Sequence, residues 1–323
     1  MEKLDVLYTV DDKYIDIMLA SALSLIINGN LNGIRLHIIT SNFSLEDYDK
    51  VENVLCKYPN VELYFYDIAT FDIEKYGIPD WRGTQIANAR LFYQDILGAS
   101  VDEMDNLLYL DSDTIVVSDL NDLEEYNTNT ISAVKDGCFK NYLTKLGGLS
   151  NYFNSGVLYF NVSNWTQERY QDKIVHFLEN CNVPLMYPDQ DALNCALDGS
   201  IESLPLNYNL GANAYLFGPR LQVHYYGKKS NVSNSEIVEA KKDPKILHST
   251  GILSIKPWSN NKINPFNDEF MKYILMANPE FEKVEISKLK QILSASPIAF
   301  RAAVIAKVYM PEPIRDFSRK LSL

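Results

Sequence analysis

The first third of the chain alternates short, dense apolar runs with longer stretches whose apolar residues recur at helical spacing. Short runs of this kind are typical of buried strands, and the longer pattern is typical of amphipathic helices. Three runs are predicted to be strands: Asp5–Val10, Ile34–Thr40 and Val61–Tyr66. Two stretches between them are predicted to be helices: Tyr14–Ile27, and one from a Ser44 N-cap to about Lys57. Strands and helices in this order, with short connections, predict right-handed βαβ units around a mostly parallel sheet.

A further apolar run, Asn106–Val117, is interrupted by Asp111-Ser112-Asp113. We interpret it as a buried strand that stops on two carboxylates and then resumes. In an open α/β sheet, ligands bind just outside the carboxyl ends of the strands. Carboxylates at positions i and i+2 of an extended chain point to one side, about 6.6 Å apart along it. A divalent cation between Asp111 and Asp113 would in turn hold a diphosphate, since hard cations take oxygen ligands.

The rest of the chain continues to alternate the two patterns. Further strands are predicted at Ile131–Val134, at Tyr152–Asn161 and at Ile246–His248. Further helices are predicted at Thr84–Leu97, at Gln167–Asn180 and, shorter, after Pro188. Residues 211–243 have little periodicity, so we expect a lid or surface loop there.

Acidic and histidine side chains recur where the predicted strands end. They occur at Asp11-Asp12, at Asp111 and Asp113, at Asp136 and at His248. Each alone has an ordinary structural explanation, such as a helix cap or a plain turn. Together they fall on the one edge of the sheet where a binding crevice is expected, so we favour a joint site. Carboxylates and imidazole suit Mn²⁺, with Mg²⁺ as the alternative, and Lys256 near this edge would stabilise a phosphate leaving group.

Composition narrows the class of partner. The chain has 323 residues, of which 46% are hydrophobic and 22% charged, as in ordinary soluble globular proteins. Its net charge of −12 argues against nucleic-acid binding and means that an anionic substrate needs a metal or local cations. The four cysteines lie far apart without a Cys-x-x-Cys motif, which favours reduced thiols. Neither a signal peptide nor an apolar run of about 18 residues is seen, so we expect a cytoplasmic protein.

Short motifs follow one another in a consistent order between Val6 and about Trp258. They are Tyr8-Thr9-Val10-Asp11-Asp12-x-Tyr14, Ala89-Arg90-Leu91, Leu108-Tyr109-Leu110-Asp111-Ser112-Asp113, Tyr152-Phe153-Asn154-Ser155-Gly156-Val157, Asn161 with Trp165, Asp189-Gln190-Asp191 with Asn194, and His248-x-x-Gly251 with Lys256-Pro257-Trp258. This ordered set resembles the family-eight glycosyltransferases, which include glycogenin and the bacterial α-galactosyl- and α-glucosyltransferases of lipopolysaccharide synthesis.

The resemblance implies the nucleotide-binding α/β fold called GT-A, a UDP-sugar donor and retention of anomeric configuration. It implies Mn²⁺ bound by Asp111, Asp113 and His248 and bridging the donor diphosphate. Residues implied to hold the nucleotide and its diphosphate are Thr9, Val10, Asp11, Tyr14, Ser112, Gly251 and Lys256. Residues implied around the donor sugar are Arg90, Asp136, Asn154 and Asp189, with Gln190 on the far face of the anomeric carbon. An amide is a poor nucleophile, which agrees with Gln190 as a stabiliser and with attack from the leaving-group side.

The pattern departs from the family at one spacing and leaves two other functions open. Four residues, 252–255, separate Gly251 from Lys256, where the family often has two. Asp111-x-Asp113 followed by Thr114 partly fits the Asp-x-Asp-x-Thr signature of phosphatases with a nucleophilic Asp, although the threonine comes one place early. A non-catalytic sugar-nucleotide binding module is the second alternative. Glucose and galactose donors both stay open, as do glycan, glycolipid and glycoprotein acceptors.

The C-terminal part differs in character. We expect a GT-A catalytic domain over residues 1–265 and a helical, basic tail over residues 266–323. From Ile286 onward, seven Lys or Arg residues stand against two acidic ones, and Pro297–Met310 is almost wholly apolar. Such a helix suits the interface of an anionic membrane, which would place the protein on the inner face of the plasma membrane. The composition suits equally a helix packed on the body of the protein or on a second subunit of a homo-oligomer.

Removal of Ser294–Leu323 tests the tail. We expect the shortened protein to lose binding to vesicles of anionic lipid, because the basic and apolar residues that would contact the lipid are gone. Its hydrolysis of a UDP-sugar should stay intact. Cosedimentation with anionic vesicles, with neutral vesicles as the control, measures the binding. Equal binding by the full-length and shortened proteins would contradict a membrane contact.

Overall fold

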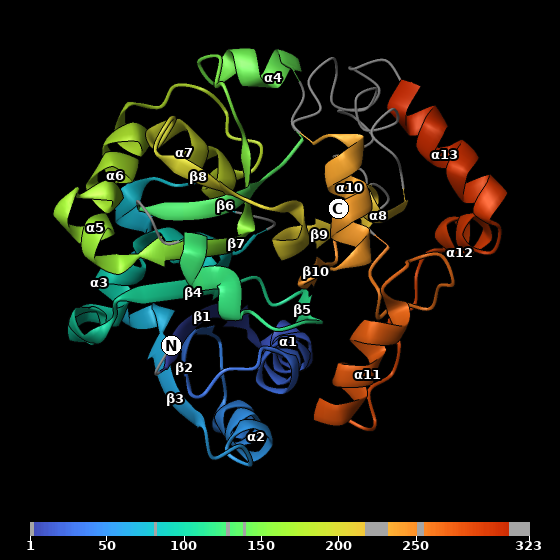
Figure 1. Cartoon of the computed structure of the whole chain (residues 1–323), viewed down its shortest axis with the longest axis horizontal. Helices are drawn as coiled ribbons and strands as arrows, with labels where there is room; N and C mark the ends of the chain where they lie inside the picture. Colours follow the sequence, from blue (N-terminus) through green and yellow to red (C-terminus); the bar gives the residue numbers. More distant parts are fainter. Residues whose placement is uncertain are drawn as a thin grey trace.

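A seven-stranded sheet forms the centre of the computed structural model, which describes residues 3–80, 83–126, 130–137, 140–216, 232–250 and 255–309. The strand order is β3-β2-β1-β4-β7-β6-β8 (Figure 1). The strands are β1 Leu4–Asp11, β2 Ile34–Ser41, β3 Val61–Asp67, β4 Asn106–Leu110, β6 Ile131–Lys135, β7 Phe153–Asn161 and β8 Ile201–Leu204. Only β7 runs antiparallel to its neighbours within this sheet. The predicted α/β class and mostly parallel sheet are confirmed.

Both faces of the sheet are buried, which explains why its strands are apolar runs rather than alternating ones. In β4, Leu108 and Leu110 belong to the core on one face, whereas Leu107 and Tyr109 belong to the core on the other. The first core includes residues of helices α1 (Ile15–Asn28), α2 (Leu45–Leu55), α10 (Asn234–Lys242) and α11 (Asn267–Ala277). The second includes residues of α3 (Tyr93–Leu97), α5 (Val162–Gln167), α6 (Tyr170–Asn180) and α7 (Pro188–Ala196). The result is three layers, with the sheet between two layers of helices (Figure 1).

Among the helices of the described residues, α1, α2, α6 and α7 lie close to the ranges predicted for them. The described helices are α1 Ile15–Asn28, α2 Leu45–Leu55, α3 Tyr93–Leu97, α4 Lys140–Lys145, α5 Val162–Gln167, α6 Tyr170–Asn180, α7 Pro188–Ala196, α8 Ala212–Leu216, α10 Asn234–Lys242, α11 Asn267–Ala277, α12 Lys288–Ser294 and α13 Pro297–Tyr309. Ser44 caps α2 as predicted and forms a capping box with Asp47.

A small second sheet joins three distant segments of the chain. It consists of β5 Thr114–Val116, β10 Ile246–His248 and β9 Leu210–Gly211, in that order. The prediction that the Asn106–Val117 strand resumes after its carboxylates is therefore corrected, because its two halves lie in different sheets. The chain turns between them, and the backbone N–H of Thr114 donates to the carbonyl of Asp111. Helix α1 holds β5 in place, since the N–H of Val116 donates to the Ser24 hydroxyl at 2.9 Å.

Two further predictions of local structure are wrong in detail. The predicted helix Thr84–Leu97 is a 3₁₀ helix over Ile86–Phe92 followed by the short α3. Residues 211–243 were predicted to be irregular, yet their described parts contain α8 and α10. Helix α10 begins at Ser233, which forms a capping box with Glu236, a spacing that the sequence does contain.

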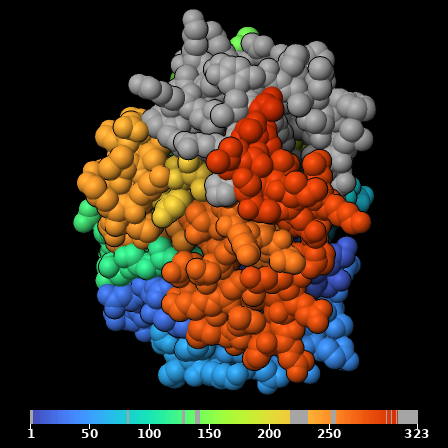
Figure 2. Space-filling view, turned by 90° about the vertical axis from the view of Figure 1, so that its right-hand side faces the viewer, coloured from blue at the N-terminus to red at the C-terminus, as the bar shows by residue number. Residues whose placement is uncertain are grey.

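The C-terminal helices lie together on one side of the molecule (Figure 2). Helix α11 packs against α1, where the Asn28 amide donates to the Tyr273 hydroxyl at 2.6 Å. Beyond α11, large apolar side chains are exposed, with Leu289 on α12 67% exposed and Ile298 on α13 82% exposed. Within the described residues, none of the helices has both the length and the apolar character needed to span a membrane.

The packing of α11 predicts a large loss of stability in Phe270→Ala. This side chain is fully buried in the core, so its truncation should lower the free energy of unfolding by about 3–5 kcal/mol. Leu275→Ala on the same helix is the control, because Leu275 is 42% exposed and should cost far less. Denaturant titrations of both variants measure the difference, and equal stabilities would contradict the packing of α11 on the core.

Candidate active site

The direction of the strands brings the predicted site residues to one edge of the main sheet. Strands β1, β4 and β6 run parallel to one another, so Asp11, Asp111 and Asp136 lie at the same edge. Because β7 is antiparallel to β4 and β6, its first residues, including Asn154, lie at this edge as well. The second sheet contributes His248, which pairs with Thr114 across β10 and β5.

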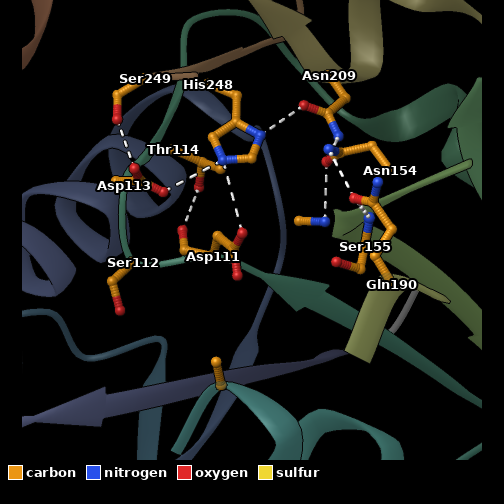
Figure 3. A network of polar contacts seen from close by, with 12 residues as sticks. Asp111, Ser112, Asp113, Thr114, Asn154, Ser155, Gln190, Asn209, His248 and Ser249 are labelled. Carbon is orange, nitrogen blue, oxygen red and sulfur yellow. Dashed lines mark hydrogen bonds and ion pairs between the residues drawn. The ribbon is translucent and has the colours of Figure 1, made fainter. Parts of the chain in front are cut away.

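Asp111, Asp113 and His248 form a cluster that fits a divalent cation (Figure 3). One ligand atom from each lies within 4.8 Å of the others. Nε2 of His248 is 3.5 Å from Oδ2 of Asp111 and 3.2 Å from Oδ1 of Asp113. Carboxylate oxygens with one imidazole nitrogen suit Mn²⁺, and carboxylates alone suit Mg²⁺.

Asp113 is also surrounded by donors. Its Oδ2 accepts from the Ser249 hydroxyl at 2.5 Å and from Nζ of Lys256 at 2.5 Å. Burial alone would raise the pKa of Asp113, but the charge of Lys256 and its hydrogen bond to the carboxylate help to hold that pKa well below its usual range. Asp113 is therefore ionised, as an oxygen ligand of a divalent cation would be. Lys256 lies beside the cluster, where a bound diphosphate would find a second positive charge.

Arg90 connects Asp111 with the segment that carries Asp189. Its Nη1 is 2.8 Å from Oδ1 of Asp111, and its Nε is 3.4 Å from Oδ2 of Asp189. Nη1 also donates to the carbonyl of Ser155 at 2.8 Å. Burial alone would lower the pKa of the Arg90 guanidinium, but the neighbouring charges of Asp111 and Asp189 keep it above its ordinary value. Arg90 thus remains charged and compensates two of the acidic groups.

A second polar network lies beside the cluster of Asp111, Asp113 and His248. The Asn154 amide donates to Oε1 of Gln190 at 3.1 Å and to Oδ2 of Asp136 at 3.1 Å. Oε1 of Gln190 also accepts from the backbone N–H of Ser155 at 3.1 Å, and Nε2 of Gln190 lies 3.4 Å from Asp136. The Ser155 hydroxyl donates to Asp189 at 2.7 Å. Burial raises the pKa of Asp136, although hydrogen bonds from Asn154 and Gly137 act against this.

The residues predicted to hold the nucleotide lie around the end of β1. Thr9 is buried and shares a hydrogen bond with the Tyr109 hydroxyl, which in turn donates to Asp111 at 2.7 Å. The Ser112 hydroxyl donates to the carbonyl of Thr9 at 3.2 Å. Val10 is buried, Asp11 caps the following turn, and the partly exposed ring of Tyr14 meets the edge of Trp258. Gly251 lies outside the described residues.

Two residues that were not predicted to bind the donor or the metal complete the site, although Ser249 belongs to the polar run His248-Ser249-Thr250-Gly251 at the end of a predicted strand. Asn209 accepts from Nδ1 of His248, and Ser249 donates to Asp113. Asn209 belongs to no sequence motif. Its contact with His248 arises only because β9 pairs with β10 in the folded chain. Ser249 directly follows His248, so its position beside a metal ligand was the only available signal.

Gly156 has a role that its place in a motif did not reveal. A Cβ atom at this position would lie 2.3 Å from Cε1 of His248 and 2.6 Å from Oδ2 of Asp111. Only a residue without a side chain therefore lets the imidazole of His248 approach Asp111 across the start of β7.

The carboxylate of Asp191 lies behind the site and is fully buried. It accepts from the hydroxyls of Tyr142 and Tyr152, both at 2.5 Å, and from the backbone N–H groups of Met186 and Tyr187, both at 2.8 Å. Burial raises the pKa of Asp191, and these hydrogen bonds oppose the shift. Asp191 thus connects α4, which contains Tyr142, to the helix that carries Asp189 and Gln190.

Gly156→Ala should weaken metal binding strongly, because the added methyl group displaces His248 or Asp111. A calorimetric titration with Mn²⁺ measures the change. Gly211→Ala is the control, since its Cβ would meet only the rotatable side chain of Thr250. Undiminished Mn²⁺ affinity in Gly156→Ala would contradict the role of this glycine.

Comparison with known proteins identifies the family of the chain. Residues 5–262 match Glycosyl transferase family 8. Lipopolysaccharide 1,2-glucosyltransferase of Escherichia coli (strain K12) is 27% identical over 274 residues, which are 82% of this chain and 75% of that protein. General stress protein A of Bacillus subtilis (strain 168) is 22% identical over 247 residues, or 75% of this chain and 82% of that protein.

Solved structures agree in fold. The galactosyltransferase LgtC, in complex with donor and acceptor sugar analogs, has a TM-score of 0.66 and 21% identity, covering 84% of this chain and 95% of that one. The WbbM bifunctional glycosyltransferase has a TM-score of 0.66 and 24% identity, and this chain covers 84% of its own length but 49% of the WbbM chain. The chain therefore has the GT-A type fold and belongs to glycosyl transferase family 8, a family of sugar-transferring enzymes.

Proposed function

We propose that this protein transfers a hexose, glucose or galactose, from a UDP-sugar to a hydroxyl group of a bacterial glycan, with retention of configuration and with dependence on Mn²⁺. Mg²⁺ is the alternative metal. The observation that carries the proposal is the position of the Asp111, Asp113 and His248 cluster beside the network of Asn154, Gln190 and Asp136. One side of this site offers ligands for a metal that binds a diphosphate, and the other offers hydrogen-bonding groups for a sugar.

We assign the binding of the donor diphosphate to a metal held by Asp111, Asp113 and His248. A divalent metal held by them would supply positive charge to the leaving diphosphate as the bond to the sugar breaks. Lys256 already lies 2.5 Å from Asp113, so a short movement of its flexible side chain would bring its ammonium group to a phosphate oxygen. In this protein, which has a net charge of −12, such local cations are required for an anionic donor to bind.

The nucleoside end follows β1. Thr9, Val10, Asp11 and Tyr14 surround the carboxyl end of this strand, and Ser112 is hydrogen-bonded to Thr9. We assign these residues to uracil and ribose. The Tyr14 ring is partly exposed and is supported by Trp258, which suits contact with a planar base.

The sugar end supports transfer without a covalent enzyme intermediate. Gln190 is an amide, and its Oε1 already accepts two hydrogen bonds. Asp189 is engaged by Arg90 and by the Ser155 hydroxyl, which lowers its capacity to attack carbon. We therefore assign Arg90, Asp136, Asn154 and Asp189 to the donor sugar. Gln190 stabilises the positive charge that develops at the anomeric carbon while the acceptor hydroxyl attacks from the leaving-group side.

The acceptor, the domain division and the location belong to the same proposal. One similar protein is named a lipopolysaccharide glucosyltransferase, which favours a glycan or glycolipid acceptor over a glycoprotein. We assign residues 1–265 to catalysis and residues 266–323 to a tail that contacts a membrane, the acceptor or a second subunit. A cytoplasmic protein with UDP-sugars at hand would work at the inner face of the plasma membrane.

Release of UDP from UDP-glucose and UDP-galactose, with and without Mn²⁺, tests the proposal. We expect release that depends on Mn²⁺ for one of the two donors, and we expect Asp113→Asn to lower donor affinity in Mn²⁺ by at least about tenfold, because a charged metal ligand is lost. Asp172→Asn is the matched control, since Asp172 is exposed on α6 and pairs with Arg169.

Three outcomes decide between the candidate functions. Metal-dependent release of UDP supports the transferase. Release of phosphate from a phosphomonoester, with no turnover of either sugar nucleotide, would favour the phosphatase. Binding of the donor with no turnover on any acceptor would favour a binding module.

A further inference from the structure

Asn209 lies between the predicted metal-binding residues, which include His248, and the hydrogen-bond network of Asn154 and Gln190 (Figure 3). It ends the 3₁₀ helix Leu206–Asn209, directly before β9, and it is 6% exposed. Its Oδ1 is 2.9 Å from Nδ1 of His248, and its Nδ2 is 2.8 Å from Oδ1 of Asn154. One buried amide therefore touches a residue of each half of the site.

Backbone N–H groups fix the orientation of every amide in this chain of contacts. A backbone N–H can only donate, so Oδ1 of Asn154 must be the atom that accepts from Gly156 at 2.9 Å. The Asn209 atom that faces this oxygen must then be its NH₂ group, which leaves Oδ1 of Asn209 facing His248. In the same way, the N–H of Ser155 fixes Oε1 of Gln190 as the partner of Nδ2 of Asn154.

The orientation of Asn209 decides the state of His248. An amide oxygen can only accept, so Nδ1 of His248 carries the hydrogen and donates it. In the neutral ring, Nε2 then bears the lone pair, and Nε2 is the nitrogen that faces Asp111 and Asp113. Metal-binding histidines are oriented in this way by a hydrogen bond to their other nitrogen.

We propose that Asn209 is a positioning residue that sets the tautomer and angle of His248 for the metal and, through Asn154, aligns the sugar-binding groups with it. This proposal deepens the proposed function and rests on it. Asn209 has two separable tasks, because its oxygen serves His248 and its NH₂ group serves Asn154. Loss of the oxygen should weaken metal binding, whereas loss of the NH₂ group should slow transfer with the metal still bound.

Two substitutions separate the tasks. Asn209→Leu removes both groups, so affinity for Mn²⁺ should fall by about 10- to 100-fold, and transfer should fall with it. Asn209→Asp keeps an acceptor for His248 but cannot donate to Asn154, so its Mn²⁺ affinity should equal or exceed that of the unmodified protein. Its rate of sugar transfer at saturating Mn²⁺ should nevertheless fall by at least about tenfold, because Asn154 loses a donor. Calorimetric titration with Mn²⁺ alone gives the affinity, and UDP release gives the rate.

Asn28→Leu controls for loss of a structural amide. Asn28 donates to the carbonyl of Val116 at 2.7 Å and to Tyr273 at 2.6 Å, away from the site. This variant should lose thermal stability and keep the Mn²⁺ affinity and transfer rate of the unmodified protein. Circular dichroism of all three variants tests whether each is folded.

The results separate this inference from the proposed function. Unchanged Mn²⁺ affinity in Asn209→Leu, or equal losses of affinity in the Leu and Asp variants, would overturn the role of Asn209 even if the protein transfers sugar. If the unmodified protein binds Mn²⁺ but transfers no sugar, the proposed function fails, while the effect of Asn209 on metal affinity is still measured. If it binds neither Mn²⁺ nor Mg²⁺, both fail.

Discussion

The structure of the site depends on holding two carboxylates close together. Asp111 and Asp113 both have a ligand atom within 4.8 Å of the other's. Two like charges at this distance repel by about 3–4 kcal/mol at the effective dielectric constant of a protein site. Arg90 beside Asp111 and Lys256 beside Asp113 offset this repulsion. A bound divalent cation would do so more completely.

The same pair of carboxylates stands where the chain passes from one sheet to the other. Strand β4 ends at Leu110 and β5 begins at Thr114, so the two carboxylates predicted to bind the metal occupy the turn between two sheets. The third predicted ligand, His248, comes from the second sheet, and Gly156 of the first sheet leaves room for it. The geometry of the three predicted ligands thus depends on how the two sheets are placed relative to each other. Asn209 is hydrogen-bonded to both His248 and Asn154, so the position of Asn154 depends on the same arrangement.

Local pattern predicted most of the fold, because buried parallel strands and capped helices leave strong signals. The strand Ile34–Thr40 and the Ser44 cap were found to within a residue. The separation of β4 from β5 was missed, since a turn of three polar residues in an apolar run looks the same whether or not the partner strand changes. The Arg90 helix was predicted as α and is largely 3₁₀, a difference that tertiary packing decides.

The residues of the site could likewise be predicted only in part from the sequence. Residues at strand ends, such as Asp136 and His248, could be predicted because the carboxyl edge of a sheet is a known place for ligands. Their assembly required the antiparallel direction of β7, which brings Asn154 to that edge and which no periodicity revealed. Asn209 stands in no motif, so nothing in its neighbourhood along the chain marks it. Asp191 stands in the Asp189-Gln190-Asp191 motif, but the motif does not reveal that its carboxylate accepts from Tyr142 and Tyr152.

The segment between Asp136 and Tyr152 has a further consequence. The backbone N–H of Asp136 donates to the carbonyl of Tyr152 at 2.8 Å, so the excursion that includes α4 closes at its own base. Its outer part is tied to the body by Tyr142 on Asp191. Both site residues at the base, Asp136 and Asn154, are therefore fixed by the sheet and not by the excursion. Because Tyr142 of this segment holds Asp191, on the helix that carries Asp189 and Gln190, the excursion still constrains the donor side of the site through its outer part and not through its ends.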